Sequence, residues 1–223
     1  MMNKKIFITG TNTEVGKTFI TKNLIERIQL KGYSVSPYKP VETGCIKKSL
    51  TLIPNDSMIY FRAINKKIAL DQINPYRFLE PISPAAAIKR SKRKVTINDY
   101  LSKLKDLPNS DLTIIEGAGG LCSPLAPDGY NIDLIRKVKV PTVLVAKDEI
   151  GVINNVILSL SMLQKYKIKV LAIVLNRKVS SQPDGMNNYQ EIKSLTKVPL
   201  IQILNKKEDN DREFKKLIKI ILV

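Results

Sequence analysis

The chain has 223 residues, of which 43% are hydrophobic, and its 37 basic and 20 acidic residues give a formal net charge of +17. It contains no histidine, which excludes mechanisms that need an imidazole base or a histidine metal ligand. No run of about 18 apolar residues predicts a transmembrane helix, and residues 1–6 lack the features of a signal peptide. Because the only cysteines, Cys45 and Cys122, show no sign of pairing, we expect a cytoplasmic protein.

Short apolar runs alternate with segments whose apolar residues recur at helical spacing. The runs predict strands at residues 4–9, 33–38, 111–116, 140–146, 170–175 and 200–204. The other segments predict helices at residues 18–31, 54–64, 85–88, 96–106, 131–138, 152–165, 187–195 and 211–222. Because the later strands are apolar without interruption, we expect them to be covered on both faces, as in a parallel sheet. The predicted fold class is therefore α/β, a single P-loop domain over residues 1–223 with a mostly parallel sheet and helices on both faces.

The most specific motif lies between the first predicted strand and the first predicted helix. Residues Gly10–Thr18 read Gly-Thr-Asn-Thr-Glu-Val-Gly-Lys-Thr, and a glycine-bounded loop in this position is typical of a phosphate-binding loop, or P-loop. In such a loop the main-chain N–H groups face the anion, Lys17 reaches the β- and γ-phosphates, and the Thr18 hydroxyl lies on Mg²⁺. Gly10 and Gly16 enclose five residues where the usual motif has four. A chance Gly-Lys-Thr at a helix start is the alternative, and the flanking strand and helix argue against it.

Ligands of open α/β sheets bind beyond the carboxyl ends of the strands, a rule that groups residues 10–18, 39–44, 116–120 and 176–177. Glu116 ends an apolar strand and precedes four residues rich in glycine, where a P-loop enzyme holds a further Mg²⁺ contact. A strand-ending glutamate before a flexible turn is the alternative. Lys39 could neutralise charge during phosphoryl transfer, although one lysine in so basic a chain is weak support. Asp56 fits either a residue that stabilises a helix dipole or a Mg²⁺ ligand, and its local sequence slightly favours the first.

Five segments, in order along nearly the whole chain, resemble the dethiobiotin synthetase family. They are Gly10–Thr18, Tyr38–Gly44, Asn74–Pro84, Glu116–Gly120 and Gly151–Asn155. The first resembles that family's own loop, G-T-D-T-[DE]-V-G-K-T, which has the same five-residue spacing. Asn12 stands in place of the family's aspartate.

The resemblance implies an ATP- and Mg²⁺-dependent ligase of biotin biosynthesis. Carbon dioxide adds to one amine of 7,8-diaminopelargonate (7,8-diaminononanoate) and gives a carbamate, which ATP phosphorylates. The second amine then attacks the mixed anhydride, so that the ureido ring of dethiobiotin closes and phosphate leaves. The resemblance also implies a homodimer with the substrate site at its interface, small-molecule substrates, and neither a nucleic-acid nor a membrane partner.

Roles for particular residues follow from the same resemblance. Lys17, Lys39 and Thr13 would be catalytic, and Thr18, Asp56 and Glu116 would hold Mg²⁺. The residues that contact the nucleotide would be Glu14, Val15, Gly16, Lys17, Thr18, Phe19, Asp56, Glu116, Gly117, Ala118, Gly119, Asn176, Arg177 and Asn205. The residues that contact the substrate would be Thr13, Lys39, Thr43, Gly151, Val152, Ile153, Asn154 and, across the dimer interface, Tyr189.

Three sites depart from the family's pattern. Asn155 stands where the family often has histidine, beside the expected pocket for the substrate carboxylate. Arg177 follows Asn176 where an acidic residue is common. Residues 202–205, Gln-Ile-Leu-Asn, replace a G-x-[IL]-P segment that contacts the base in the family. We therefore hypothesise a relaxed choice among nucleoside triphosphates.

Partition and septum-placement ATPases are the nearest alternative, since they share the P-loop architecture and dimerise on DNA or membranes. Their loop, K-G-G-x-G-K-[ST], carries a lysine at the position of Asn12, and this chain lacks it. The basic, amphipathic segment Arg212–Val223 could lie on an anionic bilayer. We favour instead a helix docked on the sheet with its lysines outward.

Two further alternatives carry less support. Amidating enzymes of the cobalamin type share similar segments, but they usually carry a glutaminase domain with a catalytic cysteine and histidine. This chain has no histidine and is too short for that additional domain. The charge of +17 fits a nucleic-acid surface, attraction of anionic substrates such as ATP, or lysines spread over solvated faces. We favour the last, because the longest basic cluster, residues 89–94, has little aromatic interleaving.

Overall fold

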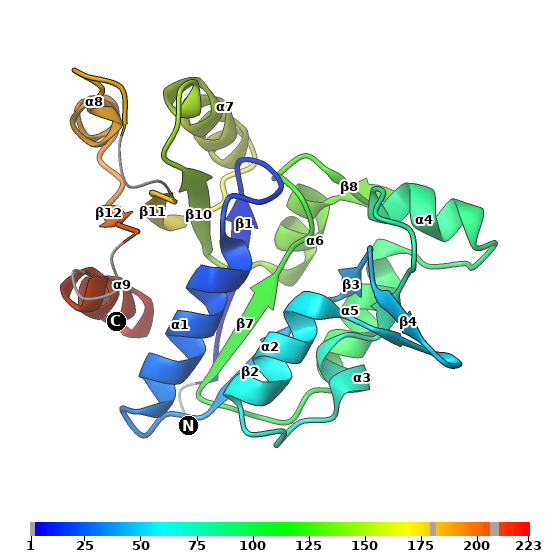
Figure 1. The fold of residues 1–223 in the computed structure, drawn as a ribbon. Helices are drawn as coiled ribbons and strands as arrows, with labels where there is room; N and C mark the ends of the chain where they lie inside the picture. The colour runs from blue at the N-terminus through cyan, green and yellow to red at the C-terminus, as the bar shows by residue number, and fades with distance from the viewer. Residues whose placement is uncertain (1–2, 179–181, 206–209) are drawn as a thin grey trace.

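The computed structural model describes residues 3–178, 182–205 and 210–223. Six strands form one central sheet in which every neighbouring pair is parallel (Figure 1). Across the sheet their order is β12–β11–β10–β1–β7–β2. They are β1 (Lys4–Gly10), β2 (Val35–Tyr38), β7 (Leu112–Glu116), β10 (Thr142–Lys147), β11 (Val170–Asn176) and β12 (Leu200–Ile203). The six predicted strands and the predicted α/β class are confirmed.

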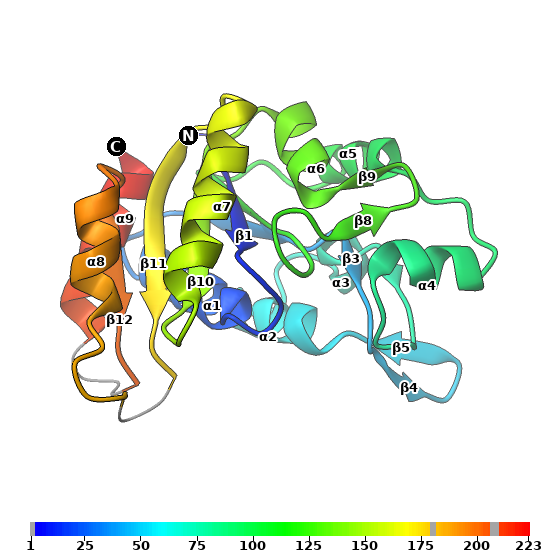
Figure 2. The same cartoon turned by 90° about the horizontal axis from the view of Figure 1, so that it is seen from above.

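Helices cover both faces of this sheet, as predicted from its apolar strands. The helices are α1 (Lys17–Gln29), α2 (Asn55–Ala63), α3 (Leu70–Ile73), α4 (Pro84–Arg90), α5 (Ile97–Lys105), α6 (Asn131–Val138), α7 (Val152–Lys165), α8 (Asn188–Leu195) and α9 (Asp211–Leu222). Alternate side chains of β1 enter different cores, because successive side chains of a strand point to opposite faces. Ile6 and Ile8 pack with α1, α2 and α9, whereas Phe7 packs with α5 and α6. Figure 2 shows α1 and α2 on one side of the sheet and α5 and α6 on the other.

Strand β2 lies at one edge of the sheet. The carbonyl oxygen of Ser34 faces β7, because it accepts a hydrogen bond of 3.1 Å from the Leu112 N–H. The main-chain groups of a strand alternate in direction, so those of Pro37 face the open edge. Proline has no N–H to leave unpaired there. The next N–H in this direction belongs to Lys39, and it donates to the carbonyl oxygen of Ile73 at 2.8 Å.

Several short elements were not predicted. Strand β3 (Val41–Glu42) pairs in parallel with β6 (Tyr76–Arg77). Strands β4 (Ile46–Lys48) and β5 (Thr51–Ile53) form a hairpin that projects beside α4 (Figure 2). Strands β8 (Pro124–Ala126) and β9 (Gly129–Tyr130) form a second hairpin. Each strand has only two or three residues, which is too short for a periodic pattern.

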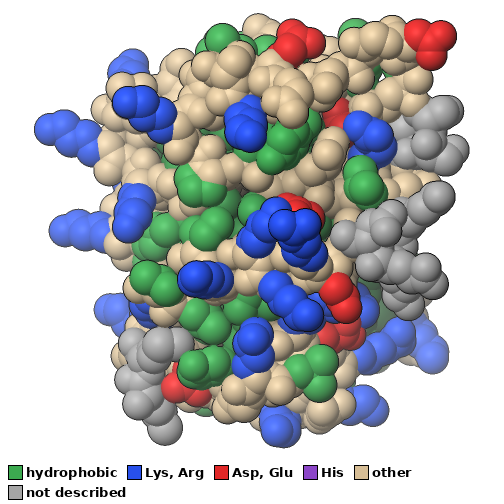
Figure 3. Space-filling model, turned by 90° about the vertical axis from the view of Figure 1, so that its left-hand side faces the viewer, with side chains coloured by type: hydrophobic (Ala, Val, Ile, Leu, Met, Phe, Trp, Pro, Cys, Tyr) green, Lys and Arg blue, Asp and Glu red, His purple; other side chains and the backbone are tan. Residues whose placement is uncertain are grey.

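The last helix, α9, docks on the sheet as predicted. Phe214, Leu217, Ile218 and Ile221 are all buried against it, and the lysines at 215, 216 and 219 are exposed. Among the described residues, none of the helices combines the length and apolar character needed to cross a membrane. Figure 3 shows lysine and arginine side chains in several groups over the face that contains α8 and α9, separated by neutral and apolar atoms. On this face the basic side chains therefore do not form one continuous patch.

Candidate active site

The P-loop connects β1 to α1 at the carboxyl edge of the sheet. Gly16 has a φ of 102°, and a Cβ there would lie only 2.1 Å from Nδ2 of Asn176, so the position requires glycine. Within the part of the chain that the structure describes, no side chain caps the start of α1. The N–H groups of its first turn are therefore free to bind an anion, which the helix dipole also favours.

The glycine-rich loop that follows β7 packs directly against the P-loop. A Cβ on Gly120 would lie 2.9 Å from the carbonyl oxygen of Thr11, so only glycine permits this contact. Asn131, the buried first residue of α6, holds the loop by donating from Nδ2 to the carbonyl oxygens of Ala118 at 2.7 Å and Gly120 at 2.9 Å. The structure thus brings the predicted segments 10–18 and 116–120 together.

Three predicted site residues, Lys39, Asp56 and Glu116, meet in an ion cluster that is buried except at Asp56, whose side chain is 36% exposed. Nζ of Lys39 lies 2.7 Å from Oδ2 of Asp56 and 2.7 Å from Oε1 of Glu116. The Thr18 hydroxyl donates to the same Glu116 oxygen at 3.4 Å. Lys39 is 4% exposed and Glu116 is 1% exposed. Charge-assisted hydrogen bonds of this kind are strong when water is excluded.

Two buried hydroxyl groups hold the other oxygen of Glu116. Oε2 accepts a hydrogen bond of 2.6 Å from Thr21 and another from the Tyr60 hydroxyl. Neither residue was predicted to take part in the site. Thr21 is one helical turn beyond Thr18 on α1, so its spacing could have indicated it. Tyr60 comes from α2, and nothing in the local sequence relates it to Glu116.

Asp56 lies in the first turn of α2, but its carboxylate points to Lys39. The helix start is instead capped by Glu42, which was not predicted. Its Oε1 accepts from the Asp56 N–H at 2.8 Å, and its Oε2 accepts from the N–H and the hydroxyl of Ser57 at 3.0 and 2.7 Å. Asp56 thus occupies the position of a helix-dipole residue, and its carboxylate also contacts Lys39.

The two lysines of the site have opposite electrostatic surroundings. Burial, together with the nearby charge of Lys39, lowers the pKa of Lys17 to about 8 despite Glu116. Burial also acts to lower the pKa of Lys39, but Glu116 and Asp56 hold that pKa well above its ordinary value. Nζ of Lys17 donates to the carbonyl oxygen of Asn12 at 2.9 Å. Lys17 is thus a desolvated cation suited to an incoming anion, whereas Lys39 already neutralises two carboxylates.

Thr18, Asp56 and Glu116 are a chemically suitable set for Mg²⁺, which prefers oxygen ligands and is commonly held by one or two carboxylates together with phosphates and water. The cluster already holds one cation, the Lys39 ammonium, between two carboxylates. Among the described residues, no group of three or more carboxylates or thiols that could hold a metal is present. The residues therefore fit an ion that is completed by other ligands.

The remaining predicted residues lie at the same end of the sheet, but in different surroundings. Nδ2 of Asn176 donates to the P-loop carbonyl oxygen of Val15 at 2.9 Å. Arg177 turns away and pairs with the buried carboxylate of Asp148 at 3.1 Å. Asn205 is exposed after β12. Thr43 follows β3, Gly151 precedes α7, and the half-buried Tyr189 lies on α8. Within the described chain, no polar side-chain contact joins any of the three to the ion cluster.

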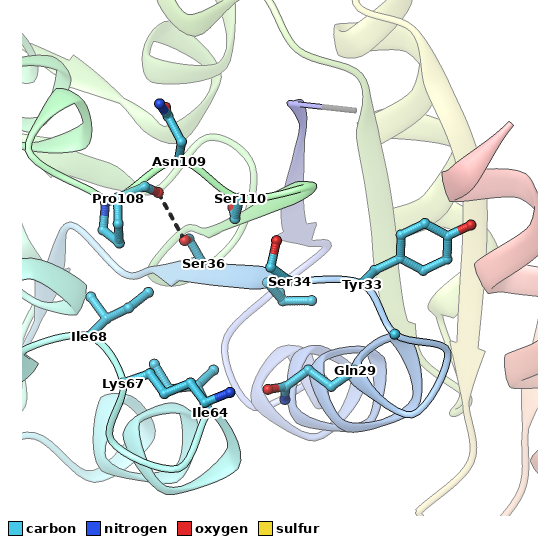
Figure 4. Close-up of a pocket in the computed structure, with 12 residues that line it drawn as sticks. Gln29, Tyr33, Ser34, Ser36, Ile64, Lys67, Ile68, Pro108, Asn109 and Ser110 are labelled. Carbon is cyan, nitrogen blue, oxygen red and sulfur yellow. Dashed lines mark hydrogen bonds between the residues drawn. The ribbon is translucent and has the colours of Figure 1, made fainter. Parts of the chain in front are cut away.

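A cavity of about 370 Å³ lies elsewhere in the molecule (Figure 4). It opens beside the start of β2, and the close-up shows Lys67 and Gln29 with their polar ends directed toward each other across it. Lys39 follows the other end of the same strand. Because the strand separates them, the cavity is not part of the site.

Comparisons with known proteins relate the whole chain to one group of enzymes. A family described as an AAA domain matches residues 4–213. A protein of Ruthia magnifica subsp. Calyptogena magnifica, named "ATP-dependent dethiobiotin synthetase BioD", is 34% identical over 98% of this chain and 100% of its own length. A protein of Methanocaldococcus jannaschii with the same name is 30% identical over 96% of this chain and 100% of its own.

Solved structures are similar in fold at much lower sequence identity. A plasmid partition protein from Borrelia burgdorferi has a TM-score of 0.62 at 12% identity and covers 100% of this chain and 99% of its own. The cell division ATPase MinD of Pyrococcus furiosus has a TM-score of 0.56 at 19% identity, with 99% and 98% covered. These similarities confirm the P-loop fold.

Proposed function

This chain belongs to the family of ATP-dependent dethiobiotin synthetases, and from that premise we propose how its residues perform the family's reaction. The chain is a ligase of biotin biosynthesis that uses ATP to form the ureido ring of dethiobiotin from 7,8-diaminopelargonate and CO₂. The observation that carries this assignment is the similarity to named dethiobiotin synthetases along nearly the entire chain. The buried lysines suit a reaction that depends on positioning and charge neutralisation rather than on an imidazole base.

The ATP phosphates bind at the P-loop, where Glu14 to Phe19 surround them. The uncapped N–H groups at the start of α1 and the Lys17 ammonium supply donors for the β- and γ-phosphate oxygens. Thr18, Asp56 and Glu116 would hold Mg²⁺, which when bound neutralises charge on these phosphates. Gly117, Ala118 and Gly119 line the cleft beside the P-loop.

The chemistry proceeds through two bond-forming steps after the carbamate has formed. A carbamate oxygen attacks the γ-phosphorus, and ADP leaves with the bridging oxygen. The second amine then attacks the carbonyl carbon of the mixed anhydride, and the C–O bond to phosphate breaks. Lys39 and Thr13 stabilise the negative charge that develops on the carbamate and the phosphoryl group, and Thr43 orients an amine. The buried position of Lys39 strengthens this interaction because water is excluded there.

The substrate carboxylate binds main-chain N–H groups at the start of α7, from Gly151 to Asn154. No side chain caps this helix start in the described structure, which supports an anion site. We propose that a second copy of the chain completes the site, with Tyr189 as its contribution. The exposed apolar side chains of Ile150 (80% exposed) and Leu158 (59% exposed) beside this site support a homodimer interface there.

We also propose a single domain over residues 1–223 that acts in the cytoplasm on small molecules rather than on nucleic acid or membranes. The family match over residues 4–213 supports one domain. The free thiols of Cys45 and Cys122 fit a reducing compartment.

The experiment that tests the function measures phosphate release from ATP with Mg²⁺, bicarbonate and 7,8-diaminopelargonate, and omits each component in turn. We expect release only in the complete mixture, with dethiobiotin identified by mass spectrometry. Release that ignores the diamine but rises with DNA or liposomes would contradict this function and favour an ATPase of the partition type.

A further inference from the structure

A lysine just beyond β11 contacts the P-loop from outside the ion cluster. The ammonium of Lys178 donates a hydrogen bond to the main-chain carbonyl oxygen of Glu14. Asn176 donates to the next carbonyl oxygen, that of Val15, at 2.9 Å. Two successive carbonyl groups of the P-loop are therefore held by two side chains from the end of one strand.

Strand geometry explains why Lys178 and Asn176 share this position while Arg177 does not. Residues i and i+2 of an extended chain point to the same face, and residue i+1 points to the other. Arg177 accordingly pairs with the buried carboxylate of Asp148 at 3.1 Å on the opposite side. The basic residue that contacts the P-loop is Lys178, whereas Arg177, which the resemblance implied as a nucleotide contact, pairs with Asp148.

The charge of Lys178 is not neutralised by a neighbouring acid. Among the described residues, no carboxylate lies within ion-pair distance of its ammonium, and the two acidic side chains of the ion cluster both contact Lys39 instead. Its Cε lies 3.7 Å from the point where a Cβ on Gly16 would be. Lys178 is also near enough to Lys17 for its charge to lower the Lys17 pKa. The P-loop thus carries two cations without an acidic partner in contact, one buried and one exposed.

We propose that Lys178 is an additional nucleotide-binding residue that recognises the phosphate chain of a nucleoside triphosphate. On binding, its ammonium exchanges the Glu14 carbonyl oxygen for a phosphate oxygen, which is a stronger acceptor because it is charged. This contact recognises the phosphates and not the base. It therefore suits a chain in which residues 202–205 lack the base-contacting segment of the family. The inference rests on the proposed function for the role of ATP.

The test measures dissociation constants for ATP, ADP and AMP, each with Mg²⁺, by equilibrium titration of the purified full-length protein. Lys178→Met should weaken ATP binding about tenfold, as expected for the loss of one charge-assisted hydrogen bond. It should weaken ADP binding less and leave AMP binding nearly unchanged. The difference between wild type and variant should shrink as salt rises, because Lys178 is exposed.

Two further variants separate phosphate recognition from a purely structural hold on the P-loop. Lys178→Gln keeps an N–H donor for the Glu14 carbonyl oxygen but removes the charge, and Lys178→Arg keeps the charge. Rescue of ATP binding by arginine and not by glutamine supports the proposal. Rescue by glutamine, or an equal loss for ATP, ADP and AMP, would overturn it, and so would unchanged ATP binding in Lys178→Met.

Lys169→Met provides a matched control. Lys169 is an exposed lysine just before the amino end of the same strand, nine residues and about 30 Å of extended chain from Lys178. Its removal changes the net charge equally but should leave ATP binding unchanged. Because these titrations need no diamine and no turnover, they remain informative if dethiobiotin formation fails, so the two proposals fail separately.

Discussion

The ammonium of Lys39 lies 2.7 Å from Oε1 of Glu116, and this ion pair is almost completely shielded from water. Asp56 contacts the same ammonium at 2.7 Å. One lysine therefore balances two carboxylates, one from helix α2 and one from strand β7. Removing one member of a buried pair leaves an uncompensated charge, which destabilises a protein far more than the loss of a surface pair does.

Lys39→Met should abolish turnover and lower the free energy of unfolding by about 3 kcal/mol when Mg²⁺ is absent. The two carboxylates would then lose their counter-ion, so added Mg²⁺ should raise the melting temperature of the variant more than that of the wild type. Thermal denaturation with and without Mg²⁺ checks this. Lys17→Met is the control, because Lys17 donates to the Asn12 carbonyl oxygen and to neither carboxylate. Equal stability of both variants without Mg²⁺ would contradict the prediction.

Thr18→Val should chiefly raise the Mg²⁺ concentration needed for half-maximal nucleotide binding, because it removes one oxygen from the proposed metal site. Thr21→Val is the matched control on the same helix. Its hydroxyl holds the other Glu116 oxygen at 2.6 Å, so this change should lower the free energy of unfolding by about 1–3 kcal/mol. Titration of Mg²⁺ at fixed nucleotide, with parallel urea denaturation, separates the two effects. An unchanged Mg²⁺ requirement in Thr18→Val would remove that residue from the metal site.

Glu42→Ala should destabilise the protein by about 1–2 kcal/mol, because three hydrogen bonds at the start of α2 lose their acceptor. The same helix start carries Asp56, so affinity for Mg²⁺-nucleotide should fall as well. Glu42→Gln retains one acceptor oxygen and should lose less stability. Urea denaturation measures the first effect, and full stability of Glu42→Ala would show that water replaces the cap without loss.

The two thiols should differ in reactivity toward a thiolate-selective disulfide reagent. Burial raises the pKa of Cys45 to about 11, so this thiol should stay unreactive at pH 8 in the folded protein. Partial burial and the nearby charge of Asp133 also raise the pKa of the Cys122 thiol. Because Cys122 is more exposed than Cys45, it should react, but more slowly than a free thiol. Reagent titration from pH 7 to pH 10, with single Cys→Ser variants, checks both.

The raised pKa of the Cys45 thiol also makes the stability of the protein depend on pH. In the unfolded chain the Cys45 thiol ionises near its ordinary pKa of 9, whereas in the folded protein it stays protonated. The unfolded state therefore binds fewer protons above pH 9, and the contribution of this group to stability declines as pH rises. Fast reaction of Cys45 at pH 8 in the native protein would contradict its burial.

The hypothesis of relaxed nucleotide choice rests on residues 202–205, which end with the exposed Asn205. We expect kcat/KM for CTP and GTP within about tenfold of the value for ATP, a gap that corresponds to about 1.4 kcal/mol. Competition assays under identical Mg²⁺ conditions provide the measurement. A preference for ATP of several orders of magnitude would refute the hypothesis.

Local patterns sufficed for the central sheet and the P-loop. The apolar runs of β1, β7, β10 and β11 marked buried strands, and the P-loop is a contiguous motif whose neighbours in sequence are also its neighbours in space. The contact between Asp56 and Lys39 could not be predicted from local sequence, because the two residues are 17 positions apart and lie on different elements. The cap supplied by Glu42 and the hydroxyl of Tyr60 escaped prediction for the same reason.

The different contacts of Arg177 and Lys178 after β11 could not be predicted for another reason. Residue type alone could not distinguish Arg177 from Lys178, since both are basic. The direction of each side chain depends on the phase of the strand, which the buried contact between Arg177 and Asp148 fixes. A site defined by side-chain direction therefore requires the register of the sheet as well as the motif.

The proline in the edge strand β2 also bears on the behaviour of the molecule at high concentration. An open sheet edge invites another chain to add a strand and begin an aggregate. Here Pro37 offers no donor toward that edge, and the N–H of Lys39 is already taken by Ile73. An incoming strand would therefore find no free N–H group at Pro37 or at Lys39, the two successive residues whose main chain faces the open edge. Pro37, which lies within β2, thus also protects this side of the sheet against self-association.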